Sequence, residues 1–182
     1  MKVMIVTDAW SPQVNGVVTT LGKIGEGLNR LGHVVRFVTP QLFKSIPCPT
    51  YPEIRLSLLP CAGVKKEIET FAPDAVHIAT EGPLGLAARR YCIKRKIAFT
   101  TAFHTRFAEY VHARIRVPVD LTYRWLRNFH APSRALMVPT PSVLRDLEAR
   151  GFVNAVAWTR GDRKSTRLNS SHERLSRMPS SA

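Results

Sequence analysis

Short apolar runs alternate along this chain with longer segments in which apolar side chains recur every three or four positions. A continuous apolar run favours a strand that is covered on both faces, and the three- or four-residue spacing is typical of an amphipathic helix. The first run, Lys2–Asp8, predicts such a strand. The segment Val17–Leu31 then predicts a helix, which Gly32 ends.

The alternation continues as far as residue 151. We expect strands at His33–Pro40, Asp74–Thr80, Ile97–Phe103 and Ala135–Pro141, a further short strand at Glu53–Leu59, and helices at Val64–Pro73, Pro83–Lys96, Pro118–His130 and Ser142–Gly151. Strands that are separated by helices imply right-handed crossovers and parallel pairing. The sequence therefore predicts an α/β fold, a Rossmann-like doubly wound parallel sheet with helices on both faces.

Ligands of such sheets bind beyond the carboxyl ends of the strands, so the loop after the first strand is a candidate site. Gly16 lies where this loop turns into the helix, and the amides of Gly16 and Val17 are placed to face an anion. The alternative is that Asn15 caps the helix and Gly16 eases the turn. The dinucleotide fingerprint G-x-G-x-x-G is absent, and we expect the glycines inside the helix to allow close packing: Gly22, Gly25 and Gly27.

Two further loops carry candidate residues. In "EGPLG", Glu81 is placed to accept from a sugar hydroxyl or to favour the positive end of a helix, and Gly82 allows close approach to the backbone. His104 follows a predicted strand end, where a site histidine is expected, although a lone histidine is more often structural. His77 lies inside a predicted buried strand.

Charge and cysteine usage narrow the function classes. The net charge of +14 raises the possibility of nucleic-acid or membrane binding, but most basic residues are scattered singly along periodic segments, which is typical of a solvated face. Cys48, Cys61 and Cys92 stand far apart, which predicts reduced thiols and a cytoplasmic protein. We find no secretory signal and no run of about 20 apolar residues that would span a membrane.

Five segments carry a resemblance to a known family. They are "IVTDAWSPQVNGVVTTL", "PTYPEIRLSL", "FAPDAVHIATEGPLGLAARRYC", "TAFHTRFAEYV" and "VPTPSVLRDLEARGF". In this order they resemble the N-terminal domain of family 4 glycosyltransferases, which are retaining enzymes of the GT-B architecture. Within the family the likeness is to bacterial GDP-mannose-dependent alpha-mannosyltransferases that act on lipid or sugar-alcohol acceptors.

The resemblance implies roles for matching residues. Asn15 and Gly16 would face the donor diphosphate and the acceptor, and His104 would contact the transferred sugar or its phosphate. Glu81 and Gly82 would help to shape the acceptor pocket. The resemblance also implies a nucleotide-sugar substrate such as GDP-mannose, no metal or other cofactor, and no dedicated protein base. From the sequence itself we add Arg106 as a candidate contact for an acceptor phosphate, or else a surface charge.

The resemblance extends over residues 1–161, which we expect to form one acceptor-side domain that stops at the interdomain hinge. "WTRG", at Trp158–Gly161, is similar to the family's hinge sequence. The following Asp162–Ala182 is rich in Ser and Arg and resembles translated sequencing adapter, so we expect a disordered, non-native tail. On this interpretation the 182-residue chain is inactive by itself.

Two alternative functions stay open: a lipid- or acceptor-binding module without turnover, and an incidental nucleic-acid binder through the aromatic and basic residues of "RWLRNFH". Residues 103–130 also combine aromatic side chains with arginines, a composition that suits peripheral docking on an anionic membrane. The competing interpretation is core-facing aromatics with solvated arginines.

Overall fold

A computed structural model describes residues 1–13, 15–48, 51–104 and 118–158. Its main sheet has six strands in the order β2-β1-β5-β6-β7-β8, and every pairing in it is parallel. The strands are β1 (Lys2–Val6), β2 (Val34–Val38), β5 (Ala75–Ile78), β6 (Phe99–Ala102), β7 (Leu136–Val138) and β8 (Ala155–Ala157). The predicted Rossmann-like parallel sheet is confirmed.

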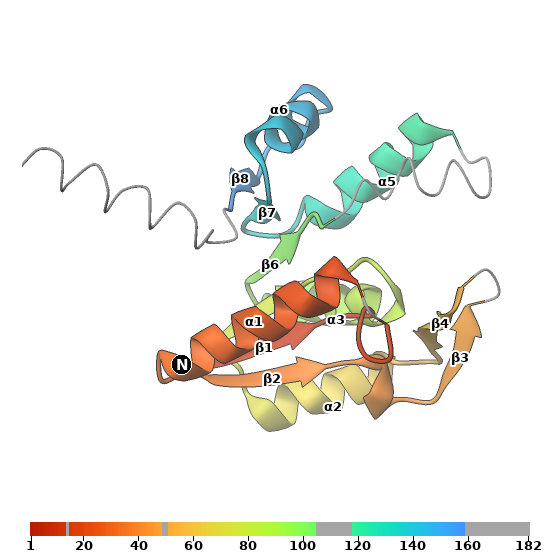
Figure 1. Cartoon of the computed structure of the whole chain (residues 1–182), viewed down its shortest axis with the longest axis vertical. Helices are drawn as coiled ribbons and strands as arrows, with labels where there is room; N and C mark the ends of the chain where they lie inside the picture. Colours follow the sequence, from red (N-terminus) through yellow and green to blue (C-terminus); the bar gives the residue numbers. More distant parts are fainter. Residues whose placement is uncertain (14, 49–50, 105–117, 159–182) are drawn as a thin grey trace, which may run out of the picture.

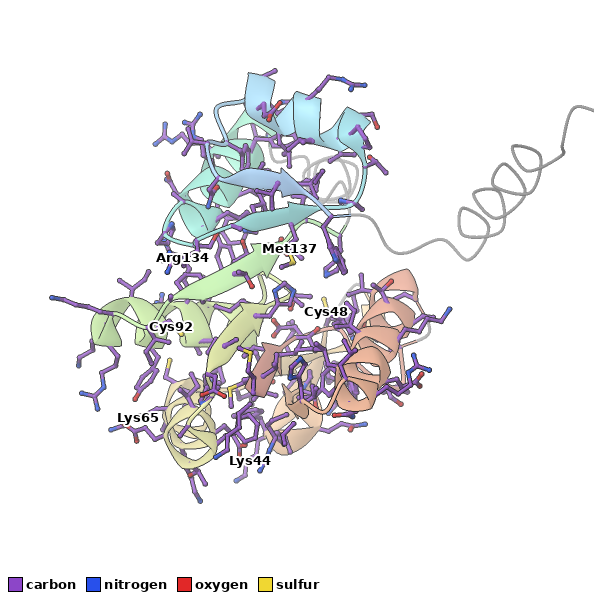
Figure 2. The ribbon with its side chains drawn as sticks, turned by 90° about the vertical axis from the view of Figure 1, so that its left-hand side faces the viewer. Lys44, Cys48, Lys65, Cys92, Arg134 and Met137 are labelled. Carbon is purple, nitrogen blue, oxygen red and sulfur yellow. The ribbon has the colours of Figure 1, made fainter. Side chains whose placement is uncertain are left out.

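Five helices of the described chain pack on this sheet, as Figure 1 shows. They are α1 (Gly16–Arg30), α2 (Cys61–Phe71), α3 (Pro83–Arg95), α5 (Val119–His130) and α6 (Pro141–Ala149). Figure 2 shows α1 on one side of the sheet and α2 and α3 on the other, with Cys92 on α3 and Lys65 on α2 labelled. The prediction of helices on both faces is therefore confirmed.

Three apolar clusters form the core. Met4 and Val6 point from β1 into the cluster beneath α2 and α3, whereas Ile5 points to the opposite face and packs with Leu21 of α1. Successive side chains of a strand point to opposite faces, so the unbroken apolar run of β1 reflects cover on both sides. The third cluster joins β7, and Phe103 just beyond β6, to α5 and α6, with Leu126, Leu136 and Leu147 completely buried.

Two glycines end helices as the sequence predicts. Gly32 has φ +79° and follows α1; its N–H donates to the carbonyl of Asn29, and the N–H of His33 donates to that of Leu28. Gly151, with φ +82°, ends α6 through the same pair of bonds. This left-handed conformation carries no penalty for a residue without a Cβ.

Three elements of the described chain have no counterpart in the sequence prediction, and one of them is β8 of the main sheet. The expected strand at Glu53–Leu59 is β4 (Tyr51–Ser57), and it pairs antiparallel with β3 (Ser45–Cys48), which the pattern did not predict. A short 3₁₀ helix, η1 (Pro40–Leu42), precedes β3. Figure 1 shows the β3–β4 ribbon projecting beside β2 rather than joining the main sheet. The tail predicted to be disordered, Asp162–Ala182, lies outside the described residues.

Candidate functional site

The strand order reverses beside β1. The chain passes from β1 to β2 on one side, whereas β5 and the later strands continue on the other side. In parallel sheets such a reversal opens a crevice at the carboxyl ends of the strands. The loops after β1, β5 and β6 meet this edge, and they carry Asn15, Gly16, Glu81, Gly82 and His104. The predicted site residues of the described chain therefore belong to one edge of the sheet.

In the loop after β1, the side chain of Asn15 caps α1. Its Oδ1 accepts hydrogen bonds from the amides of Val17 and Val18, each at 3.0 Å. The capping interpretation of Asn15 is confirmed, and the Val17 amide is already occupied within the chain. A Cβ built on Gly16 would meet no atom of the described residues within 4 Å, so these residues leave the helix start at Gly16 open. An anion at this end of α1 would meet the Gly16 amide first.

Gln13 connects this cap to the end of β1. Its side chain is buried; Nε2 donates to the carbonyl of Asp8 at 3.3 Å, and Oε1 accepts from Nδ2 of Asn15 at 3.1 Å. The side-chain amide of Gln13 thus joins the two ends of the loop after β1 through these two hydrogen bonds. Gln13 could not be predicted as a site residue, because a glutamine in a proline-containing loop gives no sign of being buried.

In the loop after β5, the start of α3 is capped from a distant part of the chain. The carboxylate of Asp8 accepts from the amides of Leu84 at 2.9 Å and Gly85 at 3.3 Å, and from Oγ1 of Thr80 at 2.9 Å. Burial raises the pKa of Asp8, against the lowering effect of these three bonds. A Cβ on Gly82 would overlap this carboxyl group. The absence of a side chain at Gly82 therefore allows the carboxyl group of Asp8 to lie close to the backbone.

Glu81, between Thr80 and Gly82, faces the end of α5. Its Oε1 lies 3.3 Å from Nε2 of His130, and the exposed fraction of the Glu81 side chain is 16%, against 1% for His130. Glu81 also contributes to the raised pKa of Asp8 by charge repulsion. The structure therefore brings two carboxyl groups and an imidazole to the loop after β5. Of Asp8, Glu81 and His130, only Glu81 was predicted from the sequence as a site residue.

His104 lies just beyond β6, half-buried, next to a second histidine. His77 of β5 makes a 2.9 Å hydrogen bond through Nδ1 to Oγ1 of Thr100 on the neighbouring strand. Burial lowers the pKa of His77 to about 4, and the nearby His104 lowers it as well. His77 is therefore neutral at physiological pH, and its role is structural, as its place in a covered strand predicts.

Part of the predicted basic and aromatic surface lies outside the described residues, including Arg106. In α5 the aromatic side chains of Tyr123 and Phe129 are buried, with exposed fractions of 4% and 3%, whereas Trp125 is 39% exposed. The core-facing interpretation is correct for Tyr123 and Phe129. Base stacking by "RWLRNFH" would need exposed rings, so the burial of Phe129 weakens the nucleic-acid alternative.

An open depression of ≈ 320 Å³ adjoins the loop after β1. Its lining includes the side chains of Trp10, Gln13, Gln41 and Arg55. The guanidinium of Arg55 donates to the carbonyl of Ser45 at 2.7 Å and to its Oγ at 3.2 Å. Arg55 thus brings a positively charged group to the lining of the depression.

Over the described part of the chain, no group of three or more His, Cys, Asp and Glu side chains is placed to hold a metal ion. None of the described helices has the length and apolar character needed to cross a membrane.

Comparison with protein families gives a match on residues 14–159 to the model described as Glycosyltransferase Family 4. These residues include the loops after β5 and β6, the end of the loop after β1, and every strand of the main sheet except β1. The chain belongs to glycosyltransferase family 4.

Curated members of this family resemble the chain over much of its length. The GDP-mannose-dependent alpha-mannosyltransferase of Mycobacterium tuberculosis is 25% identical over 88% of the chain and 47% of its own length. The alpha-monoglucosyldiacylglycerol synthase of Acholeplasma laidlawii is 32% identical over 62% of the chain and 32% of its own length. The sulfoquinovosyl transferase SQD2 of Arabidopsis thaliana is 26% identical over 65% of the chain and 24% of its own length. The chain spans about half the length, or less, of these relatives.

Proposed function

We propose that the protein carrying this chain transfers mannose from GDP-mannose, with retention of configuration, to a lipid or sugar-alcohol acceptor. The observation that carries the proposal is the family 4 match over residues 14–159. Three of the relatives are named GDP-mannose-dependent alpha-mannosyltransferases, which favours this donor. Two others are named alpha-monoglucosyldiacylglycerol synthases, which favours a lipid acceptor.

The open start of α1 is the place that we assign to the donor diphosphate. Asn15 already satisfies the amides of Val17 and Val18, which leaves the Gly16 amide and the positive end of the helix for an anion. Fixed amides and basic side chains stabilise charge that develops on a leaving group without rearranging during the reaction. We expect this stabilisation to operate without a bound metal and without a dedicated protein base.

The acceptor belongs, in this proposal, between the loop after β5 and the depression beside Trp10. Glu81 would accept a hydrogen bond from an acceptor hydroxyl, and the guanidinium of Arg55, which lines the depression, suits a polar or anionic head group. Arg106 stays a candidate for an acceptor phosphate, although it lies outside the described residues. His104 would contact the transferred sugar from the end of β6.

Donor and stereochemistry are tested together with the native protein. GDP-mannose and UDP-glucose are each supplied with a membrane lipid extract, and the glycolipid product is isolated. We expect mannosyl transfer with the α-configuration of the donor retained, as read from the anomeric signals in an NMR spectrum, and unchanged rates in EDTA. Transfer from UDP-glucose alone, or an inverted product, would contradict the proposal.

The role of His104 is tested by His104→Ala. We expect kcat to fall at least tenfold, which corresponds to about 1.4 kcal/mol of lost transition-state stabilisation. The free energy of unfolding should change little, and urea denaturation checks this. Wild-type kinetics in a folded variant would remove His104 from the site.

Peripheral docking at the cytoplasmic face of a membrane completes the proposal. Its support is the net charge of +14 and the exposure of Trp125 and Arg124 on α5. Cosedimentation with anionic and neutral vesicles at two salt concentrations tests it. We expect binding to anionic vesicles that weakens as salt rises; failure to bind either vesicle would contradict it.

A further inference from the structure

His130, the last residue of α5, is a buried imidazole whose backbone is held firmly. Its side chain is 1% exposed and packs beside the rings of Phe129 and Phe152, at centroid distances of 5.0 Å and 6.4 Å. Its carbonyl accepts from Oγ of Ser133 at 2.8 Å and from Nδ2 of Asn154 at 3.0 Å. Packing and these bonds leave the ring little freedom to turn away.

Neither ring nitrogen of His130 makes a well-aligned hydrogen bond to any residue that the structure describes. Buried polar groups in folded proteins are nearly always hydrogen-bonded, so two such atoms on one side chain require an explanation. Nε2 lies 3.3 Å from Oε1 of Glu81. This contact is close enough for a hydrogen bond but is not aligned as one.

The backbones on either side of the contact are fixed independently. The Glu81 loop is tied to β1, because Asp8 accepts from Thr80 and Leu84 on either side of it. The end of α5 is tied to α3, because Arg89 donates to the carbonyls of Asn128 and Phe129, each at 2.8 Å. The carboxylate of Glu81 thus lies between two segments that hydrogen bonds hold in place. At the candidate site, 16% of the Glu81 side chain is exposed to solvent.

We propose that His130 is a positioning residue for Glu81. With an acceptor bound, Nε2–H of His130 donates to one carboxylate oxygen, and the other oxygen accepts from an acceptor hydroxyl. Hydrogen bonds in active sites are often long or misaligned without substrate and tighten when it binds. This role accounts for Nε2, which has no aligned partner among the described residues. It rests on the proposed function, because it assigns the hydroxyl to the acceptor of that reaction.

A double-mutant cycle on the native protein tests the role through kinetics. His130→Phe keeps an aromatic ring but removes the donor, and we expect the KM for acceptor to rise about tenfold, an effect of about 1.4 kcal/mol. The KM for GDP-mannose should stay unchanged. In a Glu81→Gln background the same change should have little further effect, and His130→Gln should recover part of the loss because its amide can donate.

A matched control separates positioning from stability. Leu126→Val alters a buried residue of α5 one turn before His130 and should lower the midpoint of urea unfolding without changing the KM for acceptor. If His130→Phe changes the acceptor KM equally with Glu81 or Gln at position 81, the positioning role is wrong. It is also wrong if Leu126→Val raises that KM as much as His130→Phe does.

A second double-mutant cycle measures stability and requires no enzymatic activity. It distinguishes failure of the Glu81–His130 contact from failure of the proposed function. The urea midpoints of His130→Phe, Glu81→Gln and the double variant are compared at pH 7. Non-additive midpoints support the contact, whereas additive ones overturn it. Absence of transfer by the wild-type protein with every donor would instead overturn the proposed function, and with it the acceptor role of Glu81.

Discussion

The loop after β1 and the loop after β5 both bring a glycine to the start of a helix at the same edge of the sheet. At Gly16 the cap comes from the preceding residue, Asn15, and the space where a side chain would stand is open. At Gly82 the cap comes from Asp8, which lies 76 positions before its partner Leu84, and its carboxyl group fills that space. Gly82 thus makes room for a contact within the fold, whereas the described residues leave the space beside Gly16 unfilled.

The largest loss of folding stability is expected from Gly82→Ala. The added Cβ would overlap the carboxyl group of Asp8, which would have to leave the amides of Leu84 and Gly85. We expect the free energy of unfolding to fall by about 3 kcal/mol, because steric overlap adds to the loss of hydrogen bonds to a charged group. Urea denaturation measures the loss, with Gly16→Ala as the control. Equal stability of the two variants would remove the distinction between the loops.

Acid should lower the folding stability through His77 of β5, the strand that leads into the loop carrying Glu81 and Gly82. The pKa of His77 is lowered from 6.5 to about 4 in the folded state, so the unfolded chain binds the proton first as pH falls. Stability should therefore decrease from pH 6.5 to pH 4, with a contribution from His77 of about 3 kcal/mol. Unfolding measured across this range should show a shallower decrease in His77→Gln, which keeps a partner for Thr100. Identical pH slopes would contradict the assignment.

Asp8→Ala directly tests the cap that Asp8 provides at the start of α3. Removal of the carboxylate leaves the start of α3 without its acceptor, and we expect a loss of about 2 kcal/mol. The same change should make Gly82→Ala nearly harmless, because the atoms that the Cβ would meet are gone. The double variant is therefore expected to be about as stable as Asp8→Ala alone. Additive losses would show that Gly82 is needed for another reason.

Asn15→Ala should have a smaller effect, because the cap of the first loop involves one neutral side chain. Loss of an N-cap typically costs about 1 kcal/mol, and Asn15→Asp should restore most of it. Thermal or urea unfolding of the two variants checks the comparison. A loss as large as that of Asp8→Ala would mean that the Asn15–Gln13 contact carries more of the loop than its geometry indicates.

The features that could be predicted from the sequence are those with a local signal. Apolar runs located the strands of the main sheet other than β8, and Gly32 and Gly151 marked the ends of two helices. β3 was missed because Pro47 interrupts it and it pairs only within a two-stranded ribbon. Of the three glycines inside α1, only Gly25 lies against another element, where a Cβ would stand 2.7 Å from the ring of Phe37.

The same distinction holds within the candidate site. Asn15 was identified as a possible cap because its partners are the next residues along the chain. The Asp8 cap and the Glu81–His130 contact join segments that only the folded sheet brings together. No spacing in the sequence encodes them, and they decide what Gly82 and Glu81 can do. The positions of the loops follow from strand order, whereas their internal chemistry depends on tertiary contacts.

The smallest effect on stability, and the most informative one for function, is expected from Gly16→Val. A Cβ at this position would meet no atom of the described chain within 4 Å, and its backbone is not in the left-handed region. We therefore expect the free energy of unfolding to change by no more than about 0.5 kcal/mol. In the native protein, however, the isopropyl group would occupy the space in which we place the donor diphosphate, so kcat/KM for GDP-mannose should fall at least tenfold. Gly27→Val, which adds the same group where a Cβ also meets no atom within 4 Å, is the matched control because it lies near the far end of α1. A Gly16→Val protein with wild-type kinetics would show that the open start of α1 does not face the donor.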